Sequence, residues 1–222
     1  MNILLQHYTG EPTELVKLSV RNMSAYAARI GSEYRFLTGN LFHPALSPPC
    51  QKMYMLDEVW DRYNMVVMAD TDMFTVNGLS ENVFTDITGV GLHTDMTSEI
   101  KKKCVKKHPR LCSSNYAYWG GCLWRLDRDL RKRFREHLKT RVTEEDLAAF
   151  NGNFEDEGIM HRLAVLDKTP QDAIPHRWSY CSYLPNPETA AIIHIRTKIT
   201  PIGPKMAKMD NYLSLKNRGI IA

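Results

Sequence analysis

The strongest hydrophobic pattern in the chain is an unbroken apolar run from Met65 to Ala69 that ends in Asp70-Thr71-Asp72. A run of this length, rich in valine and methionine, predicts a strand that is buried on both faces of a sheet. Residues i and i+2 of a strand share one face, so Asp70 and Asp72 are expected to point together where the strand ends. Such paired oxygen ligands indicate a divalent-metal site that carries a phosphate-bearing substrate. The alternative is a polar strand end followed by a turn.

The residues ahead of this run predict a β-α-β unit. Asn2 to His7 and Glu33 to Leu37 are expected to form strands, and apolar residues recur at helical spacing from Thr13 to Ile30. This unit favours a parallel sheet with a nucleotide-sized crevice at the carboxyl edge of its strands. Tyr8 and Thr9 would lie at that edge, where they either hold a base or ribose or close a turn.

The chain contains neither G-x-G-x-x-G nor G-x-x-x-x-G-K-[ST], so phosphates are not cradled in the Rossmann or P-loop manner. After a proline-containing loop from Pro44 to Pro49, apolar spacing predicts a helix from Gln51 to Tyr63. Lys52 lies in its first turn, where the helix dipole disfavours a cation. It is interpreted either as a partner for a phosphate or carboxylate, or as a solvated surface lysine.

Besides a helix start with a capping acid at Thr143 to Asp146, three further helices are predicted in the second half of the chain. Two are basic and run from Asp95 to Lys107 and from Arg125 to Arg141. Their charges are interpreted as solvated faces, with an acidic acceptor or an anionic membrane surface as the alternative for the second helix. The third helix opens with three consecutive acids at positions 155–157, which the helix dipole favours without any functional role.

Composition limits the classes of function. The chain has 222 residues with 43% hydrophobic content, enough for one sizeable core, and its net charge of +4 does not demand a nucleic-acid partner. The five cysteines include no C-x-x-C pair, which indicates neither a disulfide framework nor a zinc site and favours a reducing compartment. The apolar segment after Met1 is too short for a signal peptide, and no run is long enough to cross a bilayer. A cytoplasmic protein is therefore expected.

Four stretches, taken in their order along the chain, resemble the nucleotide-sugar glycosyltransferases of the GT-A fold, and family-8-like members in particular. The D-x-D within Asp70 to Phe74 is the hallmark of that family, and Tyr116 to Leu123 resembles its glycine-bearing strand, which faces the donor sugar. Pro175 to Tyr180 resembles the L-P-x-x-[YW]-N stretch, although Ser179 stands where asparagine is usual. Ile192 to Ile195 resembles the late strand that supplies a metal-binding histidine. The resemblance covers about residues 3 to 200, and small soluble viral and bacterial glycosyltransferases are similar in size.

This resemblance implies an α/β protein of the GT-A fold, with a mostly parallel central sheet flanked by helices. It implies a single domain over residues 1–222, with a C-terminal tail at about 200–222. The activity implied is metal-dependent transfer of a sugar, of the hexosyl type, from a UDP-sugar donor to a glycan or glycoprotein acceptor. Mn²⁺ or Mg²⁺ would be held by Asp70, Asp72 and His194, and the imidazole makes Mn²⁺ acceptable beside Mg²⁺. The donor would contact Tyr8, Thr9, Lys52, Asp70, Gly120, Gly121 and Lys198.

Some positions depart from the family pattern or allow two interpretations. The usual H-x-x-G-x-x-K is broken, because Thr197 replaces the glycine and Lys198 comes two places early. This puts the phosphate-binding role of Lys198 in question but not the metal-binding role of His194. Gly120 and Gly121 would let the backbone approach the donor sugar closely, or they form a turn or bulge.

The acidic cluster after the glycine strand supplies the candidates for the catalytic group. Glycosyl transfer needs either a base that deprotonates the acceptor or a group that stabilises the oxocarbenium-like sugar. Asp156 is the first candidate and Glu157 the second, and both the retaining and the inverting outcome stay open. Lys205 and Lys208 in the tail either fold over the diphosphate or belong to the surface.

Three other functions are compatible with parts of this pattern. A phosphohydrolase of the haloacid dehalogenase type uses D-x-D-x-[TV], but Phe74 occupies the fifth position here. A sugar-nucleotide pyrophosphorylase shares the sheet but normally opens with a glycine-rich loop that this chain lacks. A non-catalytic carbohydrate-binding protein on the same fold is the third alternative, and the presence of Asp70, Asp72 and His194 together argues against it.

Overall fold

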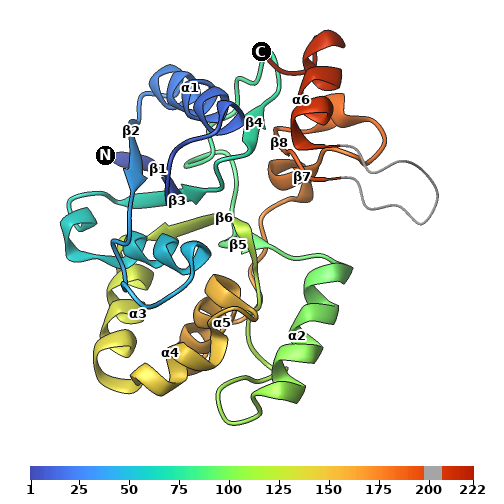
Figure 1. Cartoon of the computed structure of the whole chain (residues 1–222). Helices are drawn as coiled ribbons and strands as arrows, with labels where there is room; N and C mark the ends of the chain where they lie inside the picture. The colour runs from blue at the N-terminus through green and yellow to red at the C-terminus, as the bar shows by residue number, and fades with distance from the viewer. Residues whose placement is uncertain (198–206) are drawn as a thin grey trace.

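The computed structural model describes residues 1–197 and 207–222, and its centre is a five-stranded sheet of order β2-β1-β3-β6-β5 (Figure 1). Its strands are β1 (Asn2–Tyr8), β2 (Glu33–Thr38), β3 (Met65–Ala69), β5 (Gly91–Leu92) and β6 (Gly120–Asp127). β1 is parallel to both β2 and β3, whereas β6 is antiparallel to β3 and to β5. The α/β class and the β-α-β unit are therefore confirmed. The sheet is mixed rather than mostly parallel, because β6 starts at the edge where β3 ends and runs back beside it.

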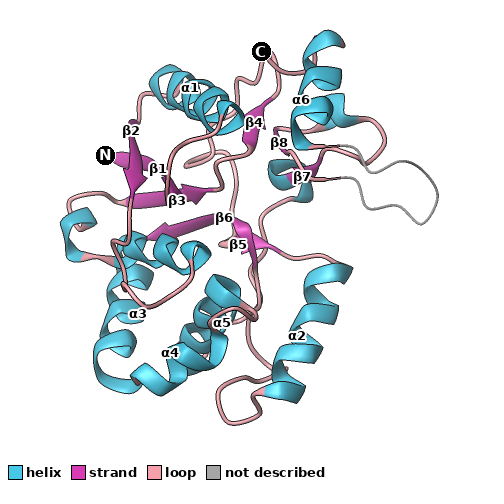
Figure 2. Cartoon of the chain, viewed as in Figure 1, coloured by secondary structure: helices cyan, strands magenta, loops and turns pink. Residues whose placement is uncertain are grey.

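Helices cover both faces of this sheet (Figure 2). They are α1 (Glu14–Arg29), α2 (Asp95–Lys107), α3 (Arg128–Arg141), α4 (Glu144–Phe150) and α5 (Glu155–Asp167). A further helix, α6 (Lys208–Asn217), packs instead in an apolar cluster with Phe74 and Ile193. Ile3 of β1 and Val66 of β3 pack in one apolar cluster with α3 and α5, whereas Leu4 and Val67 pack in another with α1. Because successive side chains of a strand point to opposite faces, a strand between two layers of helices needs apolar residues at every position. This explains the unbroken apolar run.

A second, three-stranded sheet of order β4-β8-β7 follows the D-x-D directly. It contains β4 (Met73–Thr75), β7 (Tyr180–Cys181) and β8 (Ile192–His194). β8 runs antiparallel to β4 with His194 opposite Met73, and the amide of Ile195 donates a 2.8 Å hydrogen bond to the carbonyl of Asp72. The second sheet therefore brings a histidine from late in the chain beside the two acids.

The segment predicted as a helix from Gln51 to Tyr63 instead forms two 3₁₀ helices, η1 (Pro48–Leu56) and η2 (Glu58–Trp60). Asp57 separates them because its backbone is extended, with φ −61° and ψ 150°, and its carboxylate accepts a 2.9 Å hydrogen bond from the amide of Val59. The side chain thus ends one helical segment and begins the next. Two further 3₁₀ helices are η3 (His176–Ser179) and η4 (Pro187–Thr189).

The basic helices agree with the prediction to different degrees. The helix from Asp95 to Lys107 is confirmed at both ends as α2, whereas α3 begins at Arg128 and not at Arg125. Asp127 sets this start, because its carboxylate accepts a 2.7 Å hydrogen bond from the amide of Leu130. Among the residues described, no helix is long and apolar enough to span a bilayer.

Candidate active site

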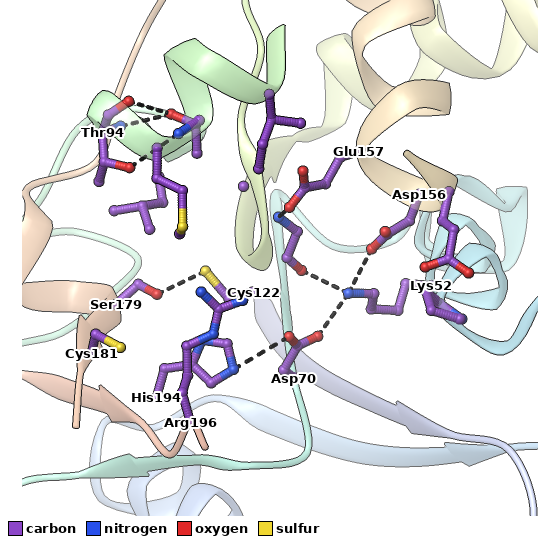
Figure 3. A pocket seen from close by; sticks show the side chains of 18 of the residues that line it. Lys52, Asp70, Thr94, Cys122, Asp156, Glu157, Ser179, Cys181, His194 and Arg196 are labelled. Carbon is purple, nitrogen blue, oxygen red and sulfur yellow. Dashed lines mark hydrogen bonds and ion pairs between the residues drawn. The ribbon is translucent and has the colours of Figure 1, made fainter. Parts of the chain in front are cut away.

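A cavity of about 830 Å³ lies at the edge where β1 and β3 end (Figure 3). Its walls come from η1, the D-x-D turn, the start of β6, the start of α5 and the end of β8. The predicted site residues that line it are Tyr8, Thr9, Lys52, Asp70, Gly120, Gly121, Asp156, Glu157 and His194. The structure therefore brings together residues that are distant in sequence. Lys198 and Lys205 lie outside the described residues.

Three metal-ligating groups meet beside this cavity. Asp70, Asp72 and His194 each offer one ligand atom, and these atoms all lie within 4.8 Å of one another. His194 Nε2 is 3.1 Å from Asp72 Oδ1 and 3.8 Å from Asp70 Oδ2. Asp72 Oδ1 is buried and accepts no well-formed hydrogen bond from any described residue. Two carboxylates and an imidazole are ligands that fit Mn²⁺ or Mg²⁺, and a bound ion would give Asp72 Oδ1 a partner.

Two cations compensate Asp72 in this state. One is His194, and the other is Lys208 in the first turn of α6, whose Nζ forms an ion pair with Asp72 Oδ2. Burial favours a raised pKa for Asp72, but His194 and Lys208 outweigh it and lower the pKa. Burial likewise favours a lowered pKa for His194, and the neighbouring Asp72 carboxylate outweighs it and raises the pKa to about 10. A bound metal ion would therefore displace the imidazole proton and release Lys208 from Asp72.

Lys52 is a buried lysine that lies between Asp70 and Asp156 in the wall of the cavity. Its Nζ lies 2.7 Å from Asp70 Oδ1 and 2.6 Å from Asp156 Oδ2, and it donates a 2.7 Å hydrogen bond to the carbonyl of Gly121. The side chain is 9% exposed, so Lys52 is not a solvated surface lysine. Burial favours a lowered pKa, but the two carboxylates raise it and keep the ammonium charged. The ammonium thus contacts three protein oxygens, which fastens both acids to β6.

The two candidate catalytic acids differ in the hydrogen bonds that their carboxylate oxygens accept. Glu157 accepts hydrogen bonds from the Gly121 amide at 2.9 Å and from the Tyr118 hydroxyl at 3.2 Å, one on each oxygen. Asp156 forms an ion pair with Lys52 through Oδ2, and no described residue donates a well-formed hydrogen bond to either of its carboxylate oxygens. Burial raises the pKa of Asp156 to about 7 against the opposing charge of Lys52, and burial also raises the pKa of Glu157.

Gly120 and Gly121 lie at the start of strand β6 and not in a turn, at the point where the pairing of β6 with β5 shifts register as in a β-bulge. A Cβ built on Gly121 would lie 2.6 Å from Asp156 Oδ2, which is closer than any real Cβ approaches an oxygen. A Cβ on Gly120 would lie 3.3 Å from Thr97 Cγ2 of α2. The lack of a side chain at Gly121 therefore leaves room for the carboxylate that Lys52 holds.

Tyr8 is the last residue of β1 and Thr9 follows it, and both lie at the rim of the cavity. The Thr9 hydroxyl is shielded from solvent and has no hydrogen-bond partner among the described residues. A polar group left in that state costs free energy, and a bound ligand with a matching donor or acceptor would recover it. The hydroxyl therefore fits the predicted role of Thr9 in holding the donor.

No protein-family model and no curated protein matches this sequence. Solved structures do match. A glycosyltransferase involved in glycosylation of the major capsid of PBCV-1 gives a TM-score of 0.54 at 10% identity, covering 97% of this chain and 98% of that one. The galactosyltransferase LgtC, in complex with donor and acceptor sugar analogs, gives 0.51 at 12% identity, covering 98% and 96%. Mouse xyloside xylosyltransferase 1 gives 0.50 at 10% identity, covering 91% and 100%. The fold is that of the GT-A glycosyltransferases.

The cavity is also lined by residues that were not among the predicted site residues. Cys122 and Ser179 form a contact in its wall, with Sγ and Oγ 2.8 Å apart, and Arg196 also lines it (Figure 3). His7 lines the cavity beside Tyr8 and is held by a 2.7 Å hydrogen bond to the carbonyl of Gly39. For His7 and Arg196 the available signal was proximity in sequence, since each is within two positions of a predicted site residue.

Proposed function

We propose that this protein is a metal-dependent glycosyltransferase that moves a sugar from a nucleoside-diphosphate donor, a UDP-sugar, to a glycan or glycoprotein acceptor. The observation that carries the proposal is the group of Asp70, Asp72 and His194 beside the cavity at the carboxyl ends of β1 and β3. Open α/β sheets bind their ligands at this edge. The GT-A fold supports the assignment, as does the structure of LgtC, which holds donor and acceptor sugar analogs on the same fold.

In this proposal the protein first prepares the metal site. Mn²⁺ or Mg²⁺ held by Asp70, Asp72 and His194 would take up the negative charge that develops on the leaving diphosphate. Lys52 fixes the orientation of Asp70, because it holds one carboxylate oxygen and leaves the other facing His194. Lys208, once released from Asp72, is free to offer a further positive charge to the diphosphate.

The contacts of the two acids support Asp156 as the catalytic group. Glu157 has both oxygens engaged by Gly121 and Tyr118, so its role in this proposal is to fix the start of β6 and the neighbouring wall of the cavity. Asp156 keeps one oxygen outside its ion pair with Lys52. With that oxygen it acts either as the base for the acceptor hydroxyl or as the group that stabilises the sugar cation.

The state of the cysteines supports a reducing compartment and hence a cytoplasmic location. All five are free thiols, four of them buried and Cys181 half-buried. Proteins that fold in oxidising compartments commonly pair their cysteines, whereas those in the cytosol keep them reduced.

The proposed activity is tested by release of UDP from a panel of UDP-hexoses, with Mn²⁺ and with excess EDTA. We expect release from at least one donor in Mn²⁺, none in EDTA, and none from Asp72→Ala. The matched control is Asp129→Ala, which removes an exposed acid from the first turn of α3 and should keep the parent rate. Mn²⁺-dependent UDP binding without release from any donor, with or without candidate acceptors, would favour the non-catalytic carbohydrate-binding alternative.

A further inference from the structure

Two cysteines lie in contact beneath the wall of the cavity. Cys104 belongs to the last turns of α2, and Cys112 lies in the segment that follows this helix. Their Sγ atoms are 3.3 Å apart, and the two residues are 0% and 6% exposed. A disulfide needs its sulfurs about 2.04 Å apart, so the pair has to close by little more than an ångström. We propose that Cys104 and Cys112 are a redox modification site and form a reversible disulfide that fastens α2 to the segment after it.

The surroundings of the pair make the two sulfurs unequal. The hydrogen bond with Cys104 lowers the pKa of Cys112 to about 6 against the effect of burial, and His161 and His108 contribute in the same direction. The same hydrogen bond and burial raise the pKa of Cys104. Since the thiolate is the reactive form, Cys112 is the nucleophile and Cys104 is the thiol that resolves the intermediate. Exposure agrees with this order, because only Cys112 has any accessible surface.

His161 holds the segment that carries Cys112. Its Nε2 accepts a 3.2 Å hydrogen bond from the amide of Ser113, and its Nδ1 lies 2.6 Å from the carbonyl of Ala117. A carbonyl only accepts, so Nδ1 carries a proton and donates it to this carbonyl. The ring therefore fixes the backbone on both sides of the turn next to Cys112, which keeps the thiol opposite Cys104.

The oxidant is a hydroperoxide, with hydrogen peroxide as the probe. The Cys112 thiolate attacks one peroxide oxygen, an S–O bond forms, the O–O bond breaks, and the leaving hydroxide takes a proton to become water. The sulfur of Cys104 then attacks the sulfenic acid, an S–S bond forms, and a second water leaves. In sum, two thiols and one hydrogen peroxide give one disulfide and two waters. A dithiol reductant reverses the change.

The disulfide would join two parts of the molecule that reach the cavity. The first half of α2 contributes Met96 and Ile100 to the cavity wall. The segment after Cys112 leads to Tyr118, whose hydroxyl donates to Glu157. The cross-link would restrict the unfolded chain by closing a short loop, so the oxidised protein should melt roughly 5 °C or more above the reduced protein. This inference does not depend on the proposed transferase activity.

The test is peptide mapping of the full-length protein after hydrogen peroxide treatment and alkylation of the remaining thiols. Trypsin cuts after Lys103, Lys106 and Arg110, so the expected link joins peptide 104–106 to peptide 111–125. Fragmentation must place it on Cys112 and not on Cys122. We expect this link, its loss in dithiothreitol, and the higher melting temperature only in the oxidised sample. Full alkylation of both cysteines after peroxide, or a link between another pair, would overturn the proposal.

Single variants test the order of the two steps. Cys104→Ser should accumulate a sulfenic acid on Cys112 that dimedone traps, whereas Cys112→Ser should leave Cys104 unlabelled. Cys181→Ser is the matched control, because this half-buried thiol is not part of the pair and the link should still form. Dimedone on Cys104 would contradict the assigned roles. The mapping of the parent protein decides the main proposal even where a variant fails to fold.

Discussion

Replacing Lys52 by methionine tests whether this lysine organises the site. Methionine keeps the length and apolar character of the stem but removes the ammonium that lies between Asp70 and Asp156. Two carboxylates then face each other without a compensating charge, and the carbonyl of Gly121 loses its donor. Removing one partner of a buried ion pair costs about 3–5 kcal/mol, because the remaining charge stays buried and unpaired. We therefore expect Lys52→Met to lower the free energy of unfolding by about that amount at pH 8.

This loss should depend on pH in a defined direction. Burial already raises the pKa of Asp156 to about 7, and removal of Lys52 should raise it further. The folded state then binds a proton that the unfolded state, with an ordinary aspartate, releases above about pH 4. A raised folded-state pKa gives stability that is present at low pH and is lost as pH rises through that pKa. The deficit of the variant should accordingly be largest at pH 8 and smaller at pH 5.

The assay is urea unfolding of the parent and variant at several pH values. The matched control is Lys102→Met, which breaks an exposed ion pair with Glu99 of the same 2.6 Å length. Exposed pairs add little to stability, so the control should unfold with the parent midpoint. The double variant Lys52→Met/Asp156→Asn should recover part of the loss, because the neutral amide needs no counter-charge. The reasoning is refuted if Lys52→Met is as harmless as Lys102→Met, or if its deficit does not change with pH.

Three further variants test the metal site, the catalytic role of Asp156 and the packing of Gly121 in β6. His194→Ala should weaken Mn²⁺ binding about 10–100-fold in titration calorimetry. In the parent, Mn²⁺ affinity should fall as pH decreases, because the imidazole of His194, whose pKa is about 10, must lose a proton to bind the metal. An Mn²⁺ affinity that does not change with pH or in the variant would leave His194 with a purely structural role. Asp156→Asn should lower turnover about 10²–10⁴-fold with donor affinity nearly unchanged, and full activity would move the catalytic role to another residue. Gly121→Ala should lower stability by about 1–3 kcal/mol in urea unfolding, since its Cβ would clash with Asp156, and a neutral effect would mean that the acid moves freely.

Elements whose signal lies in neighbouring residues could be predicted from the sequence. The apolar run before Asp70 is buried on both faces as predicted, and α2 begins and ends at Asp95 and Lys107 because Thr94 caps its start and its last turn carries lysines. The order of motifs along the chain was sufficient to place His194 with the two acids. In each of these cases the signal lies within a few residues or in the order of short segments.

Features that depend on tertiary packing were not accessible in the same way. The antiparallel direction of β6 follows from where the chain re-enters the sheet, and no residue of the glycine-bearing strand encodes it. Lys52 was recognised as oddly placed, but its partner Asp156 lies far away in sequence, so the buried network could not be read from spacing. The contact between Cys104 and Cys112 was missed for a different reason, since their spacing matches no known cysteine motif.

The most direct test of the central claim is a titration of UDP into the protein, with Mn²⁺ and with EDTA, for the parent and for Asp72→Ala. The claim is that Asp72, together with Asp70 and His194, holds a cation on which the diphosphate binds. We expect UDP binding to the parent only in Mn²⁺, weaker binding of GDP, and no Mn²⁺-dependent binding to the variant. The variant should still fold but melt below the parent, because it leaves the buried His194 without its counter-charge, so binding is measured below its melting temperature. UDP binding to Asp72→Ala in Mn²⁺ as tight as to the parent would contradict the metal site and the function proposed from it.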